Sequence, residues 1–360
     1  MMDYLRYYIG PVCVAIGALG FFLGTDWVWL GFATYFVLAS ADIFLPKDTK
    51  ERNIINPVLA DVPLYCHFIL MIAMYVFFTL FAKEGNLTWF QVTGAILSLG
   101  WLSAVPNLPA QHELMHRKGL IPRVCTFILG GLYGDPIKGI AHIHGHHLDF
   151  GTSADTDQAR RGETMYTFPF RASWGSYSHA WRAEKRRLQN KSLPALSINN
   201  LCVQAIIFEI VLFSAISLVA GALATIIAVI GIVIAKILVE AFNYYQHYGL
   251  VRSENESYGR RHLWNHLQPA ARSVAFEITN HSDHHMDTFK PFYKLKPDTS
   301  GPQMPSIFLC FMTGLIPPLW FRYIAMPKLK QWDKQYATPE EKKLAMEANK
   351  QANWPIWLDD

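Results

Sequence analysis

Histidine is the side chain whose distribution stands out in this sequence, because 13 of its 14 copies fall between residues 112 and 285. They gather in four short motifs: HELMH at 112–116, HIHGHH at 142–147, the HYG at 247–249 that closes NYYQHYGL, and HSDHH at 281–285. Helical residues three or four apart share a face, so three of these motifs can each present two imidazoles to one point. Adjacent histidines differ by about 100° around a helix and can face two ions. The spacing therefore predicts a site for two metal ions.

Nine histidines are expected to bind metal: His112, His116, His142, His146, His147, His247, His281, His284 and His285. His144 points away from the face that His142 and His146 share. The remaining histidines, interpreted as core or surface residues, are His67, His179, His262 and His266. Imidazole alone suits zinc, copper, iron and nickel. Nine ligands exceed what one ion takes, and structural zinc prefers four ligands with frequent thiolate, so two irons are the better prediction.

Neutral imidazoles would leave a large positive charge on two irons, which polar neighbours can offset. The candidates for this outer layer are Glu113, Asp155, Asp157, Glu240, Asn243, Glu277 and Asp283. Glu240 lies seven residues before His247 and four after Lys236, so the three can share one helical face. An ionisable residue inside an apolar segment is a candidate for function, although a Lys236–Glu240 pair that only stabilises a helix bundle is the alternative.

The elements that would position these residues follow from the composition. The chain has 360 residues, of which 51% are hydrophobic and 17% charged, against about 25% charged in a typical soluble domain. A membrane protein is therefore expected. Six apolar windows are long enough to span a bilayer: roughly 7–24, 27–45, 64–82, 89–110, 203–220 and 222–242. The expected fold is an all-α integral membrane protein with six transmembrane helices and a cytoplasmic, histidine-rich di-iron cap.

The charge of the connections predicts the topology. The joins within each pair of windows are short and nearly uncharged, whereas the other connections and the C-terminal region are rich in charge, which places them and both termini in the cytoplasm. We expect four transmembrane helices in residues 1–110, a cytoplasmic segment with the first two histidine motifs in 111–200, a helix pair in 201–243, and a cytoplasmic segment in 244–360, as one integrated fold. The weaker apolar runs 124–134 and 306–321 are not counted as spans.

Other function classes find little support. A net charge of +4 does not indicate nucleic-acid binding, and the five cysteines are scattered without a CxxC pair. The chain has no dinucleotide-binding fingerprint and no flavin or iron–sulfur motif, so a redox reaction would need electrons from a separate protein. A basic stretch between Arg182 and Lys191 is a candidate surface for an acidic partner, with an ordinary solvated helix face as the alternative.

The histidine motifs resemble those of the membrane-bound non-haem di-iron oxygenases, which include fatty-acid desaturases, sterol oxidases and alkane 1-monooxygenases. NYYQHYGL resembles an additional motif of the alkane 1-monooxygenase branch, which the desaturases lack. Within that branch, the chain is similar over essentially its full length to hydroxylase components of the xylene and p-cymene monooxygenase type. The segments that carry this similarity are LRYYIGPV, ILSLGWLSAVPNLPAQHELMHR, YGDP, KILVEAFNYYQHYGLVR, EITNHSDHH, QMPSIFLCFMTGLIPPLWF and PKLKQWDKQYATPEEKKLAMEANKQANWPIW. The alkane enzymes usually have an arginine at the position of His144.

The resemblance implies hydroxylation of a methyl group on an apolar aromatic such as toluene, a xylene or p-cymene. It also implies two non-haem irons, consumption of dioxygen, and electrons from NADH through a flavin and [2Fe–2S] reductase, or through a rubredoxin-type carrier in the alkane branch. The expected location is the bacterial inner membrane, with the active site on the cytoplasmic side. A bilayer dissolves such substrates, and Trp29, Phe32, Tyr35 and Trp101 are candidates for the substrate pocket.

Several alternatives stay open at this point. HELMH also matches the HExxH signature of zinc proteases, with Glu113 as the base, but such a site leaves six further clustered histidines unexplained. A medium-chain alkane 1-monooxygenase, or a fatty-acid desaturase or hydroxylase, would share the histidine motifs. A metal carrier would place ligands across the middle of the membrane rather than at one face. About two irons per chain would separate an oxygenase from a protease or a carrier.

Overall fold

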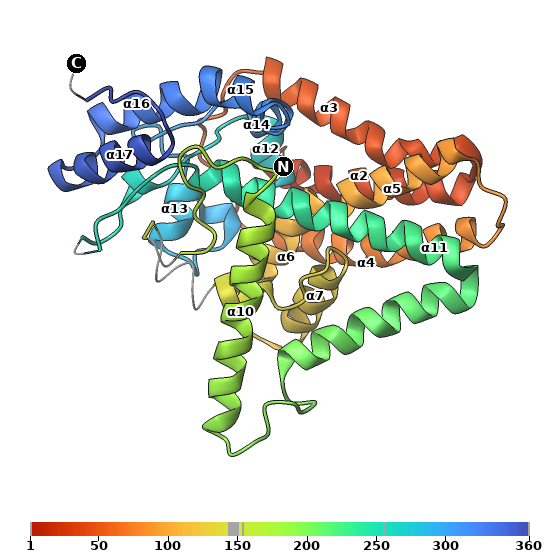
Figure 1. Ribbon diagram of the computed structural model, residues 1–360. Coiled ribbons are helices and arrows are strands. Elements are labelled where there is room, and N and C mark those ends of the chain that lie inside the picture. The colour runs from red at the N-terminus through yellow and green to blue at the C-terminus, as the bar shows by residue number, and fades with distance from the viewer. Residues whose placement is uncertain (1, 143–150, 153–154, 255, 359–360) are drawn as a thin grey trace.

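The computed structural model describes residues 2–142, 151–152, 155–254 and 256–358, and these segments are almost entirely helical (Figure 1). One isolated bridge between Asn265 and Gln303 is the only strand-like pairing in these ranges. The helices of the first half are α1 (Met2–Leu5), η1 (Arg6–Tyr8), α2 (Ile9–Leu23), η2 (Thr25–Trp29), α3 (Leu30–Phe44), α4 (Pro57–Ala82), α5 (Trp89–Ala104), α6 (Asn107–Met115), α7 (Leu120–Gly131), α8 (Lys138–Ala141) and α10 (Phe168–Gln189). Those of the second half are α11 (Leu201–His247), η4 (Arg260–His262), α12 (Pro269–Val274), α13 (His281–Met286), η5 (Phe292–Lys294), α14 (Ile307–Gly314), α15 (Pro317–Trp320), η6 (Phe321–Ala325), α16 (Met326–Gln335) and α17 (Pro339–Gln351).

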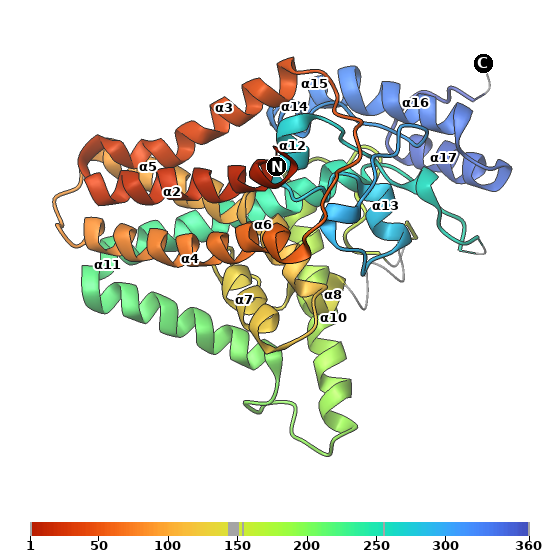
Figure 2. The ribbon, with the colours of Figure 1, turned by 180° about the vertical axis from the view of Figure 1, so that it is seen from behind.

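The apolar helices lie side by side along the long direction of the molecule. In Figures 1 and 2, α2, α3, α4 and α5 run alongside the C-terminal arm of α11, and α2 contacts both α3 and α4 while α5 packs against α11. Glycines allow the closest of these approaches, because a Cβ added to Gly100 of α5 would lie 2.7 Å from a methyl carbon of Ile234 on α11. Small residues at such crossings let helix backbones come together in a bilayer, where packing drives association.

Within the described residues, four helical stretches are long and apolar enough to cross a membrane: Asp3–Leu23, Thr25–Phe44, Pro57–Ala82 and Leu201–His247. The prediction of an all-helical membrane protein is confirmed at this level. The windows 203–220 and 222–242 form the single element α11 of 47 residues, which changes direction at Gly221. That glycine has φ +81°, in the left-handed region that a residue with a Cβ rarely adopts. The window 89–110 is divided between α5, which has 16 residues, and α6.

Local sequence explains where the apolar helices begin. The side chain of Asn56 accepts from the backbone N–H groups of Val58 and Leu59 at the start of α4. Thr88 and Gln91 form a reciprocal capping box at the start of α5. Such caps satisfy backbone donors that a helix leaves without partners in its first turn.

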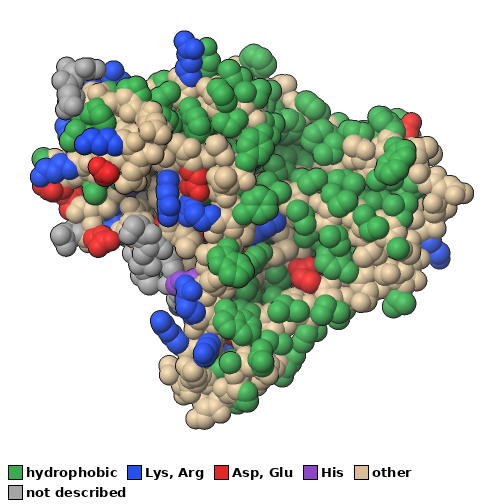
Figure 3. All heavy atoms as spheres, in the orientation of Figure 1, with side chains coloured by type: hydrophobic (Ala, Val, Ile, Leu, Met, Phe, Trp, Pro, Cys, Tyr) green, Lys and Arg blue, Asp and Glu red, His purple; other side chains and the backbone are tan. Residues whose placement is uncertain are grey.

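The short helices of the second half lie at one end of the bundle, close to the N-terminus. Helices α12 to α17 cover this end, and α10 crosses the direction of the apolar helices (Figures 1 and 2). Hydrophobic side chains dominate the surface of the apolar helices, whereas most charged side chains lie over the end that holds α12 to α17 (Figure 3). This charged end also contains the described histidines of the four motifs.

Candidate metal centre

The first histidine motif lies on α6, directly after the end of α5. Pro106 lies between α5 and α6, and it favours a break there because it has no N–H to donate to a preceding carbonyl. Helix α6 then carries His112 in its last turn and ends at His116, so their rings share one face with centroids 4.8 Å apart. His112 is buried and His116 is half-buried.

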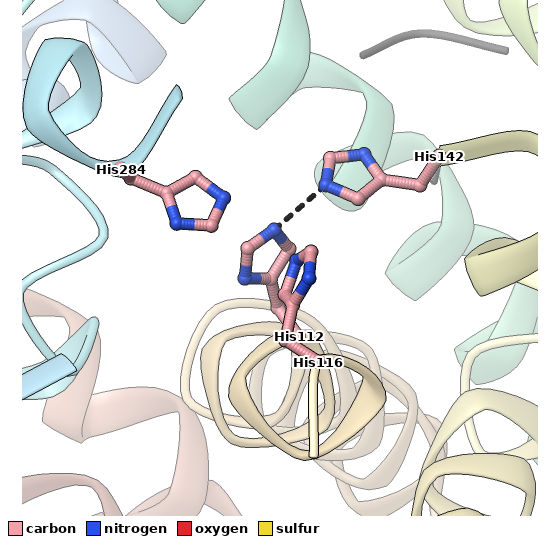
Figure 4. Close-up of side chains that lie close together, drawn as sticks. All are labelled: His112, His116, His142 and His284. Atoms are coloured by element: carbon pink, nitrogen blue, oxygen red, sulfur yellow. Dashed lines mark hydrogen bonds between the residues drawn. The ribbon is translucent and has the colours of Figure 1, made fainter. Parts of the chain in front are cut away.

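Four histidines from three elements form one group (Figure 4). His112 and His116 come from α6, His142 follows the end of α8, and His284 lies on α13. One ring nitrogen of each lies within 4.8 Å of the others. The Nε2 atoms of His112 and His142 are 2.8 Å apart, and the His284 ring centroid is 4.8 Å from that of His112.

Three further histidines form a second group: His247, His281 and His285. His247 is the last residue of α11, and the chain turns away two residues later at Gly249, which has φ +65°. The Nε2 atoms of His247 and His281 are 3.1 Å apart. All three imidazoles are buried.

Helix α13 connects the two groups. Its six residues give His284 to the first group and both His281 and His285 to the second. The ring centroids of His284 and His285 are 5.6 Å apart and their planes are nearly perpendicular, at 87°. Adjacent histidines on one short helix therefore face two neighbouring sites, as the HSDHH spacing predicts.

The donor sets suit two transition-metal ions. Two nitrogens that bind one ion at about 2.1 Å lie roughly 3 Å apart, and one nitrogen pair in each group has about that separation. Metal binding requires neutral imidazole, and burial lowers the pKa of His116 to about 4. A set made only of imidazole nitrogens fits iron, which the sequence analysis favoured, without distinguishing it from other ions.

The structure brings together seven of the nine histidines in the predicted ligand set. The other two, His146 and His147, lie outside the described residues, as does His144. The histidines interpreted as core residues lie elsewhere: Nε2 of His262 is 2.6 Å from Glu341, and Nδ1 of His266 is 2.7 Å from the carbonyl of Pro305.

Buried ionic contacts join α8, which precedes the second motif, to α11, which carries HYG. The ammonium of Lys138 lies 3.3 Å from Glu240 and 3.3 Å from Asp157. Glu240 also binds Lys236 at 2.6 Å and accepts a hydrogen bond from Asn243 at 3.1 Å. Burial alone would lower the pKa of Lys138, but the carboxylates of Asp157 and Glu240 raise it above the ordinary value. Glu240, proposed from the sequence, thus connects α8 and α11 through Lys138, and Asn243, also proposed, contacts Glu240 within α11.

The other predicted carboxylates contact the protein in different ways. Glu113 accepts a hydrogen bond from Nε of Arg117 at 2.7 Å, and burial raises its pKa to about 7 against the effect of that guanidinium. Asp155 accepts a bond from the backbone N–H of Asp157 at 2.9 Å.

Asp283 binds Arg260 at 2.8 Å and Lys290 at 2.5 Å. Although burial opposes its ionisation, Lys290, the backbone of Lys296 and Arg260 hold the pKa of Asp283 below its ordinary value. Its contacts therefore anchor α13 to the surrounding loops.

Glu277 anchors the segment that leads into α13. Its buried carboxylate accepts hydrogen bonds from Arg52 and Arg272, each at 2.6 Å, and from Asn280 at 2.9 Å. Phe276 and Glu277 have φ +46° and +58°, which costs free energy for residues with a Cβ and persists only where the surroundings hold it. The two arginines provide that restraint four residues before His281.

The four aromatic residues predicted to line a substrate pocket pack largely against one another. The rings of Tyr35 and Trp101 are 5.1 Å apart, those of Phe32 and Tyr35 are 6.0 Å apart, and those of Trp29 and Phe32 are 6.2 Å apart. Trp101 also donates a hydrogen bond to Thr34 at 2.9 Å. A role in substrate binding stays a prediction for all four.

Between the histidine groups lies a small cavity of about 20 Å³, enough for roughly one water molecule. Its lining includes histidines of both groups, and the complete set is Leu108, His112, Met115, Lys138, His142, Phe242, Asn243, Gln246, His247, Ile278 and His281. Lys138 and Met115 were not proposed from the sequence. Lys138 could have been found because it is a lysine in a mostly apolar stretch, four residues before His142 and therefore on the same helical face. No local sequence pattern distinguishes Met115.

The fold and the site together define a helical membrane protein with two adjacent groups of histidines that could hold metal ions, at one end of its apolar helices. The family model for fatty acid desaturases matches residues 87–305. The chain is 44% identical to the xylene/toluene monooxygenase hydroxylase component of Pseudomonas putida, over 99% of this chain and 98% of the relative. It is 30% identical to alkane 1-monooxygenase 2 of Pseudomonas aeruginosa, over 86% and 87%, and 28% identical to the alkane 1-monooxygenase of Ectopseudomonas oleovorans, over 80% and 71%.

The chain belongs to the fatty acid desaturase family and, within it, to the membrane monooxygenases that include these relatives. It is therefore an oxygen-dependent monooxygenase.

Proposed function

We propose that this protein hydroxylates the methyl group of apolar aromatics of the toluene, xylene and p-cymene type to the benzylic alcohol. The reaction consumes one dioxygen and two electrons and forms one alcohol and one water. The observation that carries the substrate class is the 44% identity over nearly the whole of both chains to a xylene/toluene monooxygenase hydroxylase. The alkane 1-monooxygenases are less similar and match a smaller share of the chain.

The two histidine groups would hold two irons. Bound and reduced, the irons would supply dioxygen activation for insertion of one oxygen atom into a C–H bond. We include His146 and His147 in the ligand set. The protein's own part is to keep the imidazoles neutral, to fix their directions and to limit water. Burial of six of the seven described ligands supports this role, and the contacts of Lys138 and Glu240 hold α8 against α11.

Placement in the bilayer is also part of the proposal. We propose six spanning segments: those formed by α2, α3, α4 and α5, and the two arms of α11 on either side of Gly221. The charged end with α12 to α17 then lies in the cytoplasm with both termini, and the membrane is the bacterial inner membrane. The domain limits 1–110, 111–200, 201–243 and 244–360 describe this arrangement as one integrated fold. Reporter fusions at the two ends and near Gly221 test it, and a periplasmic report from either end would refute it.

Electrons would come from NADH through a separate flavin and [2Fe–2S] reductase, with a rubredoxin-type carrier as the alternative donor. The exposed side chains of Arg182, Lys185 and Arg186 on α10 give that donor a basic surface. Reversal of these three charges should lower turnover at low salt more than at high salt, because surface electrostatics are screened. Unchanged turnover and salt dependence would reject this surface.

The central experiment uses membranes that contain this protein together with a compatible reductase. Supplied with NADH, dioxygen and a panel of toluene, xylenes, p-cymene and octane, they should form benzylic alcohols faster than octanol. Membranes without the reductase are the control. Preferred octanol formation would replace the proposed substrate with a medium-chain alkane, and insertion of a double bond into acyl chains would indicate a desaturase. Metal analysis should give about two irons per chain, whereas one zinc per chain would contradict the di-iron assignment.

A further inference from the structure

A second cavity lies next to the metal centre and has about 430 Å³, a size typical of small-molecule sites. Elements α6, α7 and α8 and the first residue of α11 enclose it. The lining residues are Leu114, Met115, Arg117, Lys118, Gly119, Arg123, Thr126, Phe127, Pro136, Ile137, Gly139, Ile140 and Leu201. By contrast, the cavity between the histidine groups has room for only one water-sized molecule.

Met115 separates the two cavities. Among the described residues, it is the only one that lines both. It is half-buried and lies between the two histidines of the first motif. A Cβ added to Gly139 of α8 would lie 3.8 Å from the sulfur atom of Met115. Helix α8 therefore packs directly against the Met115 side chain, with no larger side chain between them. Methionine has three rotatable side-chain bonds and changes shape at little cost, which suits a movable partition.

The larger cavity is amphiphilic. Its inner walls are apolar, with Phe127, Ile137 and Ile140 among them. The hydroxyl oxygen of Thr126 is buried and forms no hydrogen bond within the described part of the chain. A buried hydroxyl without a partner is costly, because it has lost its hydrogen bonds to water. A ligand with an apolar ring and one hydroxyl group would fill the walls, and rotation of the Thr126 side chain about its Cα–Cβ bond would bring its hydroxyl within hydrogen-bond reach of that group.

The mouth of this cavity lies beside exposed apolar side chains. Exposed Lys118 and Arg123 lie at its edge, and the neighbouring side chains of Leu120 and Ile121 on α7 are 73% and 67% exposed. A cationic edge next to exposed apolar side chains is typical of the boundary between lipid and water. An aromatic alcohol distributes to that boundary, whereas the parent hydrocarbon needs no hydrogen-bond donors and dissolves in the lipid interior.

We propose that this cavity is the exit passage for the benzylic alcohol, with Met115 as its gate and Thr126 as the residue that binds the alcohol hydroxyl. The assignment rests on the proposed function for the identity of the product. It explains why the lining combines apolar walls with an orphaned hydroxyl. The cavity would also release the alcohol at the boundary between lipid and water, whereas the hydrocarbon substrate comes from the lipid interior.

Binding is tested by cysteine protection in the metal-loaded, full-length protein. Ile140→Cys is placed on the cavity wall in a chain whose five native cysteines are replaced by alanine, and N-ethylmaleimide is the probe. We expect 4-methylbenzyl alcohol to protect the introduced thiol at lower concentration than p-xylene. Thr126→Val should weaken protection by the alcohol about three- to tenfold, the effect of one hydrogen bond, and leave protection by p-xylene unchanged. Thr93→Val, which removes an exposed hydroxyl on α5, is the matched control.

Gating is tested by kinetics. Met115→Trp should lower the steady-state turnover while the amount of alcohol formed in a single turnover and the iron content stay as in the parent. Met115→Leu, which conserves volume, is the control. Since Met115 adjoins a metal ligand, Phe127→Trp on α7, a helix that carries no histidine of either group, provides a second obstruction, with Val124→Trp on the exposed face of α7 as its control.

The outcomes separate the two proposals. Equal protection by alcohol and hydrocarbon, or no effect of Thr126→Val, would overturn the exit site. A loss of single-turnover product as large as the loss of steady-state turnover in both tryptophan variants would overturn the gate. Parent protein that forms no benzylic alcohol would refute the proposed function instead, and the protection experiment would still report which molecule the cavity prefers.

Discussion

Replacement of Asp333 by asparagine should destabilise the end of the protein that holds α12 to α17. Asp333 on α16 receives two hydrogen bonds from Arg161, at 2.6 and 2.7 Å, and one from Trp357 at 2.7 Å. The side chains of Asp333 and Arg161 are both fully buried. Arg161 also donates to the carbonyl of Gly249 at 2.9 Å, two residues after His247. The pair therefore joins the C-terminal helices to the segment that carries the second histidine group.

The size of the effect follows from the burial of the pair. Removal of one partner of a buried ion pair costs about 3–5 kcal/mol, because the remaining charge stays out of water without compensation. With an unfolding entropy of roughly 2.1 cal/mol/K per residue and a chain of 360 residues, the Tm should fall by about 4–7 °C. Asp333→Asn isolates the loss of the negative charge, since the asparagine side chain has the same shape as aspartate and its amide oxygen can still accept the hydrogen bond from Trp357.

The assay is thermal unfolding of the detergent-solubilised protein, with limited trypsin digestion as a second measurement. Glu340→Gln is the control, because Glu340 and its partner Lys343 are 61% and 68% exposed and such surface pairs contribute about 0–1 kcal/mol. The double variant Arg161→Met, Asp333→Leu removes both charges and should recover most of the lost Tm. A Tm for Asp333→Asn within about 1 °C of the parent, or a double variant less stable than the single one, would refute the reasoning, because an uncompensated buried charge costs more than that.

Three further predictions concern the anchoring of the metal centre and the C-terminal helices. Glu277→Gln should lower iron affinity up to about tenfold, because it weakens the restraint on the segment before α13; iron retention during dialysis against a graded chelator measures it, and unchanged retention would exclude this role. Although burial opposes its ionisation, His262 and Arg261 lower the pKa of Glu341 to about 2, so its stabilising effect is present above about pH 4.5 and lost as the pH falls toward 2. The Tm difference between parent and Glu341→Gln should therefore shrink across that interval, and a constant difference would contradict it. Removal of metal by a chelator should lower the Tm and Fe²⁺ should restore it, whereas a Tm that does not respond to metal would argue against ions bound by these histidines.

The sequence predicted the local features of the site well. Spacing within HELMH and HSDHH is a property of one helical turn, and apolar windows report burial in lipid without knowledge of the partners. The path of the chain between windows was harder to predict. Windows 203–220 and 222–242 were predicted as two helices joined at Gly221, and the structure has two helical arms that meet there, whereas window 89–110 is divided between α5 and α6.

Long-range partners were the main limit. Asp283 was proposed near the ligands because of its position in HSDHH, and the structure shows which cations it binds, Arg260 and Lys290. Lys138 and Glu240 are 102 residues apart in the chain, so no local pattern connects them. Glu277 was chosen as a carboxylate close to the third motif, but its restraint by Arg52 depends on a segment 225 residues away.

Helix α13 has a consequence for how the metal centre is assembled. Helix α13 has six residues, and its three histidines belong to both groups. An ion bound in one group would therefore restrict the motion of α13, which must also be held in place for an ion to bind in the other group. The conformational entropy of α13 is then lost once rather than twice, which makes the two binding events positively cooperative. If the two groups hold two irons, as proposed, chains with a single iron would be scarce when iron is limiting.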